Sequence, residues 1–184
     1  MTATDHVNSF LIILAIIFLS FSPLKSHADH TKDIEKAGDI IQVAIPAIAY
    51  GSTFYMDDKE GRNQFYKGFA TNFVVTHGLK HAIDKERPNG GKHSFPSGHT
   101  SASFQGASFI HKRYGAKYAI PAYIGASFVG YSRIKANKHD TTDVLAGAVI
   151  GTMSSWYFTK EYDNATIALN ASTDYYGVTL HLTH

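Results

Sequence analysis

The chain has 184 residues, enough for one domain with its own hydrophobic core. It carries 17 Lys and Arg against 15 Asp and Glu, so a net charge of +2 gives no indication of a nucleic-acid partner. The absence of cysteine excludes disulfides, thiolate metal sites and cysteine nucleophiles.

The N-terminal segment is typical of a signal peptide. Its apolar run, Phe10–Phe21, is shorter than the roughly 20 residues that a bilayer span needs, but it suits the hydrophobic region of a signal. The small residues Ser26 and Ala28 stand at the usual cleavage positions, although no Lys or Arg precedes the run. We therefore expect a signal peptide at residues 1–28 and one domain at residues 29–184. Retention of the segment as an anchor or as a buried helix is the alternative.

The rest of the chain is a succession of apolar segments. Five of them predict helices: residues 40–55, 63–83, 100–114, 118–131 and 143–158. Pro46 is expected to kink or divide the first helix. The tail from Thr166 to Thr183 alternates in places, which predicts a short β-hairpin turning at Asp174–Gly177. The sequence thus predicts an all-α bundle of five or six helices, with polar connections at residues 84–99 and 132–142.

Three polar segments carry the groups that phosphoryl transfer needs. They are Lys80 to Pro88, Pro96 to Thr100, and Ser132 to Asp143. The first and third supply three cations, Lys80, Arg87 and Arg133. Arginine matches phosphate oxygens with a planar fork, whereas lysine acts as a point charge. The second places Ser97 and Gly98 just before a predicted helix, whose N–H groups can bind an anion.

Two histidines complete this set. His139 and Asp143 are four residues apart at the start of a predicted helix, so the carboxylate can orient the imidazole and leave its other nitrogen free to attack. His99 is a second imidazole, available as general acid for the leaving oxygen. The cations meet the charge of the transferred group, so the site needs no metal and no other cofactor.

The pattern Lys-x6-Arg-Pro, Pro-Ser-Gly-His and Ser-Arg-x5-His-x3-Asp resembles the signature of the type 2 phosphatidic acid phosphatase superfamily. That superfamily also includes class A acid phosphatases and vanadium haloperoxidases. The resemblance implies an all-α bundle with its site at one end of the helices, and a phosphatase that works through a phosphohistidine on His139. It also implies Asp143 as partner and His99 as acid. The phosphate-binding residues it implies are Lys80, Arg87, Ser97, Gly98 and Arg133.

Several functions are open at this point. The apolar helices, rich in small residues, favour a lipid-linked phosphate or diphosphate as substrate, hydrolysed at a membrane surface in the bacterial envelope. The family implies phosphatidic acid, phosphatidylglycerol phosphate, undecaprenyl diphosphate and lipid A phosphates as candidates. The mean hydropathy of −0.14 and the short apolar runs favour a soluble periplasmic acid phosphatase that acts on small phosphoesters.

Three further readings have weaker support. A vanadate-dependent oxidase would use the same residues, but such enzymes are usually much longer. A catalytically inactive envelope protein is disfavoured because every motif residue is present. His77 and His81 have the spacing of a zinc pair, but the sequence supplies no clear third ligand, so we expect them to be structural.

Overall fold

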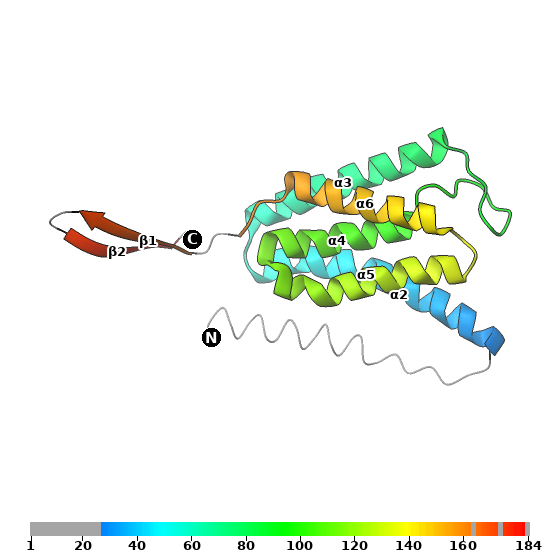
Figure 1. Ribbon diagram of the computed structural model, residues 1–184, viewed down its shortest axis with the longest axis horizontal. Helices are drawn as coiled ribbons and strands as arrows, with labels where there is room; N and C mark the ends of the chain where they lie inside the picture. Colours follow the sequence, from blue (N-terminus) through cyan, green and yellow to red (C-terminus); the bar gives the residue numbers. More distant parts are fainter. Residues whose placement is uncertain (1–26, 163–164, 173–174, 183–184) are drawn as a thin grey trace.

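The computed structural model describes residues 27–162, 165–172 and 175–182 (Figure 1). The apolar run predicted to be a signal peptide lies outside these residues. Within the described part of the chain, five helices come first: α2 (His27–Tyr55), α3 (Lys59–Ala82), α4 (Gly98–Tyr114), α5 (Ala116–Lys135) and α6 (Thr141–Phe158). Two strands follow, β1 (Ala165–Ser172) and β2 (Tyr175–Leu182), and they pair with each other in antiparallel fashion. The predicted all-α class and the C-terminal hairpin are both confirmed.

Polar residues define where three of the helices begin. The side chain of Asp58 accepts a hydrogen bond from the N–H of Gly61 at the start of α3. Ser97 caps α4 in the same way, and Asp140 caps α6. These caps satisfy N–H groups that lack a partner inside the helix, so short polar sequences set the helix starts.

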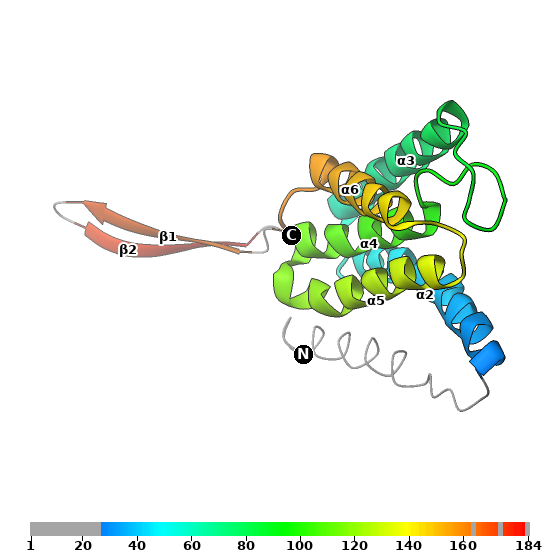
Figure 2. The same ribbon diagram turned by 45° about the vertical axis from the view of Figure 1, so that its right-hand side comes forward.

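Helix α4 lies at the centre of the bundle, with α3 and α6 on one side and α2 and α5 on the other (Figure 1, Figure 2). Its buried face carries Phe109 and Ile110, which pack into the main hydrophobic cluster. The ring of Phe109 meets the ring of Phe65 edge to face, with centroids 5.1 Å apart. Small residues such as Ala107 and Ala126 fill the remaining contacts, so the helices can approach closely.

Two glycines bring α6 against the first turns of α4. A Cβ atom on Gly147 would lie 2.5 Å from the carbonyl oxygen of Ser97, and one on Gly151 would lie 2.2 Å from that of Ser101. Neither position can hold a larger residue without moving a backbone. The starts of α4 and α6, where two of the three motif segments lie, are therefore held together by this contact.

The predicted boundaries need three corrections. Helix α2 continues through Pro46 as one element, and Gly106 of α4 lies against the proline backbone there. Helix α5 extends to Lys135, so Arg133 is helical and does not lie in the connection after it. In the hairpin, Ser172 pairs with Tyr175, so both tyrosines of the predicted turn Asp174–Gly177 belong to β2.

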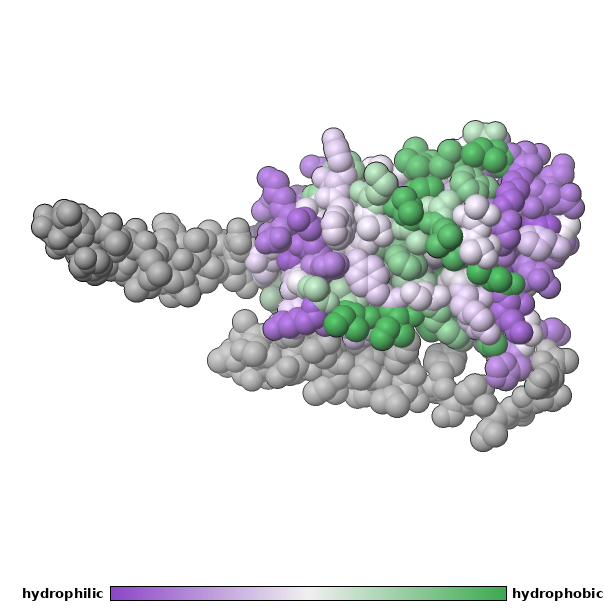
Figure 3. All heavy atoms as spheres, viewed as in Figure 1, coloured by the Kyte–Doolittle hydropathy of each residue, from purple (hydrophilic) through white to green (hydrophobic). Residues whose placement is uncertain are grey.

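The outer faces of α5 and α6 carry exposed apolar side chains. On α6, Leu145, Val149 and Met153 are 56% to 66% exposed, and Ile120 and Ile124 on α5 are exposed to a similar extent. The view in Figure 3 shows hydrophobic residues across the middle of the bundle and hydrophilic residues towards its two ends. The two helices are therefore apolar on more than their core-facing side. Within the described residues, however, no helix combines the length and hydropathy that crossing a bilayer requires.

Candidate active site

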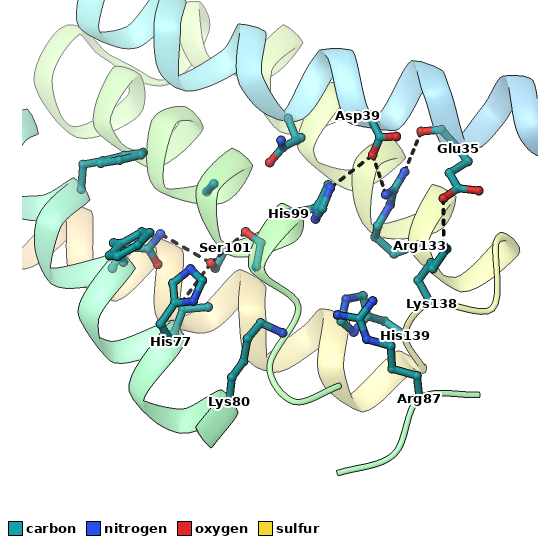
Figure 4. Close-up of a pocket in the computed structure, with 17 residues that line it drawn as sticks. Glu35, Asp39, His77, Lys80, Arg87, His99, Ser101, Arg133, Lys138 and His139 are labelled. Atoms are coloured by element: carbon teal, nitrogen blue, oxygen red, sulfur yellow. Dashed lines mark hydrogen bonds and ion pairs between the residues drawn. The ribbon is translucent and has the colours of Figure 1, made fainter. Parts of the chain in front are cut away.

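A cavity of about 480 Å³ lies at the end of the bundle where α3 ends and α4 and α6 begin (Figure 4). Six of the predicted site residues line it: Lys80, Arg87, Gly98, His99, Arg133 and His139. Phe69, Phe73 and Ala102 add apolar surface, and Glu35, Asp39 and Gln42 of α2 close another side. The three motif segments, distant in sequence, thus converge on one space.

His139 and Asp143 meet at the first turn of α6. Asp140 and Asp143 form a reciprocal capping box: each side chain accepts a hydrogen bond from the backbone N–H of the other, at 3.0 and 3.2 Å. This box holds the Asp143 carboxylate with Oδ2 3.5 Å from Nδ1 of His139. The predicted carboxylate–imidazole pair is therefore built into the helix start.

Asp143 is fully buried, and its charge is met from two sides. Lys85 Nζ lies 2.8 Å from Oδ1, and the hydroxyl of Ser94 donates to Oδ2. Burial alone would raise the pKa of Asp143, but these hydrogen bonds outweigh it and hold the pKa below its usual value. The carboxylate therefore stays ionised beside His139 at neutral pH.

His139 is almost fully buried beside cationic groups. Burial, followed by the positive charges of Lys80 and Arg87, lowers the pKa of His139 to about 4, although Asp143 acts in the opposite direction. The imidazole is therefore neutral at pH 7. Contact with Asp143 favours the proton on Nδ1, which leaves an unprotonated Nε2 as a nucleophile.

Two of the cations are oriented by the backbone of the segment between α3 and α4. Lys80, in the last turn of α3, donates to the carbonyl oxygen of His93 at 2.9 Å. Burial and the nearby Arg87 lower the pKa of Lys80 to about 8. Arg87 donates from Nε to the carbonyl oxygen of Lys92 at 3.0 Å. Since both donate to neutral main-chain carbonyl oxygens here, their charges remain available for an anion in the cavity.

Arg133 is buried and anchored to α2. Its Nη1 donates to Asp39 Oδ1 at 2.7 Å, and its Nη2 donates to the carbonyl oxygen of Glu35 at 2.6 Å. Its Nε donates to Ser132, whose hydroxyl also bonds the carbonyl oxygen of Val129. The motif serine Ser132 thus helps to position the guanidinium of Arg133 and does not line the cavity.

The three residues Ser97, Gly98 and His99 at the start of α4 have different roles. Ser97 is buried: its Oγ accepts from the N–H of Thr100, and its own N–H donates to the carbonyl oxygen of Asp143 at 2.9 Å. It caps the helix and is absent from the cavity lining, and its predicted phosphate contact stays a prediction. Gly98 and His99 do face the cavity.

His99 lies on the other side of the cavity from His139 (Figure 4). Its Nε2 is 3.2 Å from Asp39 Oδ1. Burial and the positive charge of Arg133 lower the pKa of His99, while Asp39 opposes them. A bound phosphate would add negative charge here and favour the protonated form that a general acid needs.

The sequence did not predict several residues that contact the predicted site residues, among them Asp39, Glu35, Lys85 and Ser94. Lys85 lies within the first motif segment, and its positive charge complements the negative charge of Asp143. The sequence spacing alone, however, does not show that the two side chains pair. Asp39 and Glu35 lie on a helix far from the motifs in sequence. The predicted structural role of His77 and His81 stays a prediction; among the described residues, no group of three or more His, Asp or Glu is placed to hold a metal ion.

The sequence profile of the PAP2 superfamily matches residues 57–167, more than half of the chain. The chain therefore belongs to the PAP2 superfamily, as the three motif segments predicted. The match includes all the motif residues, from Lys80 to Asp143.

Two curated relatives and one solved structure sharpen the comparison. The lipid A 1-phosphatase of Porphyromonas gingivalis is 41% identical over 78 residues, which are 40% of this chain and 18% of that protein. The lipid A 4'-phosphatase of Helicobacter pylori is 28% identical over 167 residues, 83% of this chain and 82% of that protein. The chain thus spans less than a fifth of the first relative and most of the second. The crystal structure of Aquifex aeolicus LpxE shares the fold, with a TM-score of 0.53 and 22% identity over 65% of this chain and 83% of that one.

Proposed function

We propose that this protein is a phosphatase that hydrolyses a lipid-linked phosphate without a metal, through a phosphohistidine on His139. The observation that carries the proposal is the buried pair of His139 and Asp143, whose histidine lines a cationic cavity. A neutral, oriented imidazole beside three cations is equipped to attack phosphorus. The same residues would serve a phosphomonoester or a diphosphate, since both present a terminal phosphoryl group.

The first chemical step forms a bond from Nε2 of His139 to phosphorus and breaks the bond from phosphorus to the leaving oxygen. His99 gives its proton to that oxygen, so the alcohol or phosphate leaves in neutral or singly protonated form. The imidazolium that develops at His139 is stabilised by Asp143. In the second step, water attacks phosphorus, passes a proton to His99, and releases inorganic phosphate from His139.

The cations act on the transferred group during both steps. Lys80, Arg87 and Arg133 line the cavity from three directions, and Gly98 presents the start of α4. Negative charge spreads over the equatorial oxygens in the transition state, and fixed positive groups stabilise it there. Main-chain carbonyls hold Lys80 and Arg87 in place, and helix α2 holds Arg133. These cations therefore need little rearrangement when substrate binds.

A lipid substrate is supported by the relatives and by the surface. Both bacterial relatives are named as lipid A phosphatases, and the second aligns over most of its length. The apolar outer faces of α5 and α6 would contact acyl chains, while the charged end carries the cavity towards head groups (Figure 3). We place the protein at the membrane surface of a bacterial envelope, exported by the segment 1–28 with residues 29–184 as the enzyme.

The test compares phosphatidic acid and lipid A in mixed micelles with p-nitrophenyl phosphate, alongside carbonate extraction of membranes. We expect kcat/KM to be at least about tenfold higher on a lipid phosphate, the factor that 1.4 kcal/mol of additional binding gives. Activity should survive exhaustive chelation. A protein released by carbonate that prefers the soluble ester would contradict the lipid substrate and support a periplasmic acid phosphatase. Loss of activity on chelation, restored by a divalent metal, would contradict the metal-free mechanism.

A further inference from the structure

Asp39 of α2 joins two residues of the proposed active site. Its Oδ1 atom lies 3.2 Å from Nε2 of His99 and 2.7 Å from Nη1 of Arg133. Since His99 belongs to α4 and Arg133 to α5, one carboxylate oxygen links three helices at the cavity (Figure 4). Asp39 lies outside the three motif segments, so this link is a property of the folded bundle.

The first effect of Asp39 is on Arg133. The guanidinium is buried, and a buried charge needs a counter-ion and hydrogen-bond acceptors. Asp39 supplies the carboxylate, and the carbonyl oxygen of Glu35, one turn earlier on the same helix, accepts from the other Nη atom. Helix α2 thereby sets the direction in which the fork of Arg133 can meet a phosphate.

The second effect is on His99, which lies between groups of opposite charge. Burial, Arg133 and Arg87 all lower the pKa of His99, whereas Asp39 raises it. The other titratable groups that line this cavity are Glu35, His77, Lys80, Lys138 and His139. A general acid must hold its proton until the leaving oxygen departs, so the neighbouring carboxylate favours the competent form of His99.

We infer that Asp39 is a positioning residue that orients His99 and favours its protonated form for proton transfer to the leaving oxygen. The inference rests on the proposed phosphatase function. A protonated imidazole has an N–H on each ring nitrogen. The N–H of Nε2 donates to Asp39, and the proton on Nδ1 goes to the leaving oxygen as its bond to phosphorus breaks. Asp39 only accepts this hydrogen bond, and His99 regains its proton from the attacking water.

The test uses Asp39→Asn and two soluble esters of similar shape, phenyl phosphate and p-nitrophenyl phosphate. Nitrophenolate leaves readily without a proton, whereas phenolate needs one. We expect kcat on phenyl phosphate to fall by roughly 10²-fold, the lower end of the usual contribution of a general acid, and kcat on the nitrophenyl ester to fall much less. The alkaline limb of the kcat profile should move to lower pH, because loss of the carboxylate lowers the pKa of His99. A misdirected Arg133 would instead raise KM for both esters.

The matched control is Asp33→Asn. It makes the same substitution at an exposed carboxylate of α2 that does not line the cavity. Its alkaline limb should stay in place. Equal losses on the two esters in Asp39→Asn, with the limb unmoved, would overturn the inference.

If Asp39→Asn does not fold, Asp39→Glu decides by the same comparison. The longer side chain keeps the charge but displaces the oxygen, so a greater loss on phenyl phosphate supports the inference, and equal losses or none overturn it. Full activity in a folded His139→Ala variant would contradict the proposed function itself, whatever the Asp39 variants do.

Discussion

The two ends of the bundle each hold a buried carboxylate, and the two are used differently. At the end away from the cavity, Asp58 accepts two hydrogen bonds from Arg113, at 2.7 and 2.6 Å, and a third from Tyr114. The remaining guanidinium nitrogen of Arg113 donates to the carbonyl oxygens of Lys160 and Glu161. This network joins the turn before α3, the end of α4 and the segment after α6, and each polar group is satisfied inside the protein.

At the cavity end, the network around Asp143 is left open on one side. Lys85 and Ser94 satisfy the carboxylate, but the histidine that it orients presents a free nitrogen to the cavity. Lys80 and Arg87 donate to main-chain carbonyls, which leaves their charge uncompensated by those acceptors. The comparison shows how one fold uses buried charge for stability at one end and keeps it available for a ligand at the other.

The largest expected effect separates activity from stability at the cavity end. His139→Ala should lower kcat by at least about 10³-fold, because the covalent step has no other nucleophile. The urea midpoint should stay close to that of the native protein. Rapid quenching during turnover should show an acid-labile, base-stable phosphoryl label on His139. Replacement of the exposed His30 by alanine is the matched control, and near-native kcat in a folded His139→Ala protein would remove His139 as nucleophile.

The second variant, Asp58→Ala at the other end of the bundle, should lower stability and leave activity nearly unchanged. Asp58→Ala leaves Arg113 buried without its counter-ion, which should lower the free energy of unfolding by about 3–5 kcal/mol. Urea denaturation measures this change, and kcat at low temperature, where the variant is folded, should remain near native. Replacement of the exposed Asp57 by alanine, one residue earlier, serves as control. A large loss of kcat in folded Asp58→Ala protein would show that the two ends are not separate.

The smallest expected effect concerns Lys85, which satisfies the buried charge of Asp143 and helps to orient this carboxylate beside His139. Lys85→Met should lower kcat by roughly tenfold, the equivalent of about one charge-assisted hydrogen bond in orienting Asp143. Because Lys85 helps hold the pKa of Asp143 down, its removal raises that pKa. The acid limb of the kcat profile, where the coupled pair of His139 and Asp143 takes up protons, should therefore move to higher pH. Lys92→Met, in the same segment, should leave the limb in place, and an unmoved limb in Lys85→Met would contradict the role.

The helices and the motif residues are predictable because each rests on local sequence. Apolar periodicity gives the five helices, and capping residues such as Ser97 and Asp140 lie where the polar segments meet them. The pairing of His139 with Asp143 also follows from spacing, since both lie within one turn of the same helix start. These features need no knowledge of how the helices pack.

The remaining features depend on packing. The contact between Asp39 and His99 exists only because α2 and α4 lie side by side, and nothing local to Asp39 distinguishes it from other acidic residues on α2. Helix α2 continues through Pro46, although proline disfavours a helix interior, because tertiary contacts such as Gly106 against its backbone support it. The position of Ser97 outside the cavity follows from the close approach of α6, which occupies its N–H.

The capping box of α6 ties the integrity of a helix end to the chemistry beside it. Helix ends open more readily than helix centres, and such local opening does not require the whole domain to unfold. When the first turn of α6 frays, Asp140 and Asp143 lose their reciprocal hydrogen bonds, and the imidazole of His139 loses its alignment at the same moment. Heat should therefore inactivate this protein reversibly below its melting temperature, with faster amide exchange at Asp143 as the early sign.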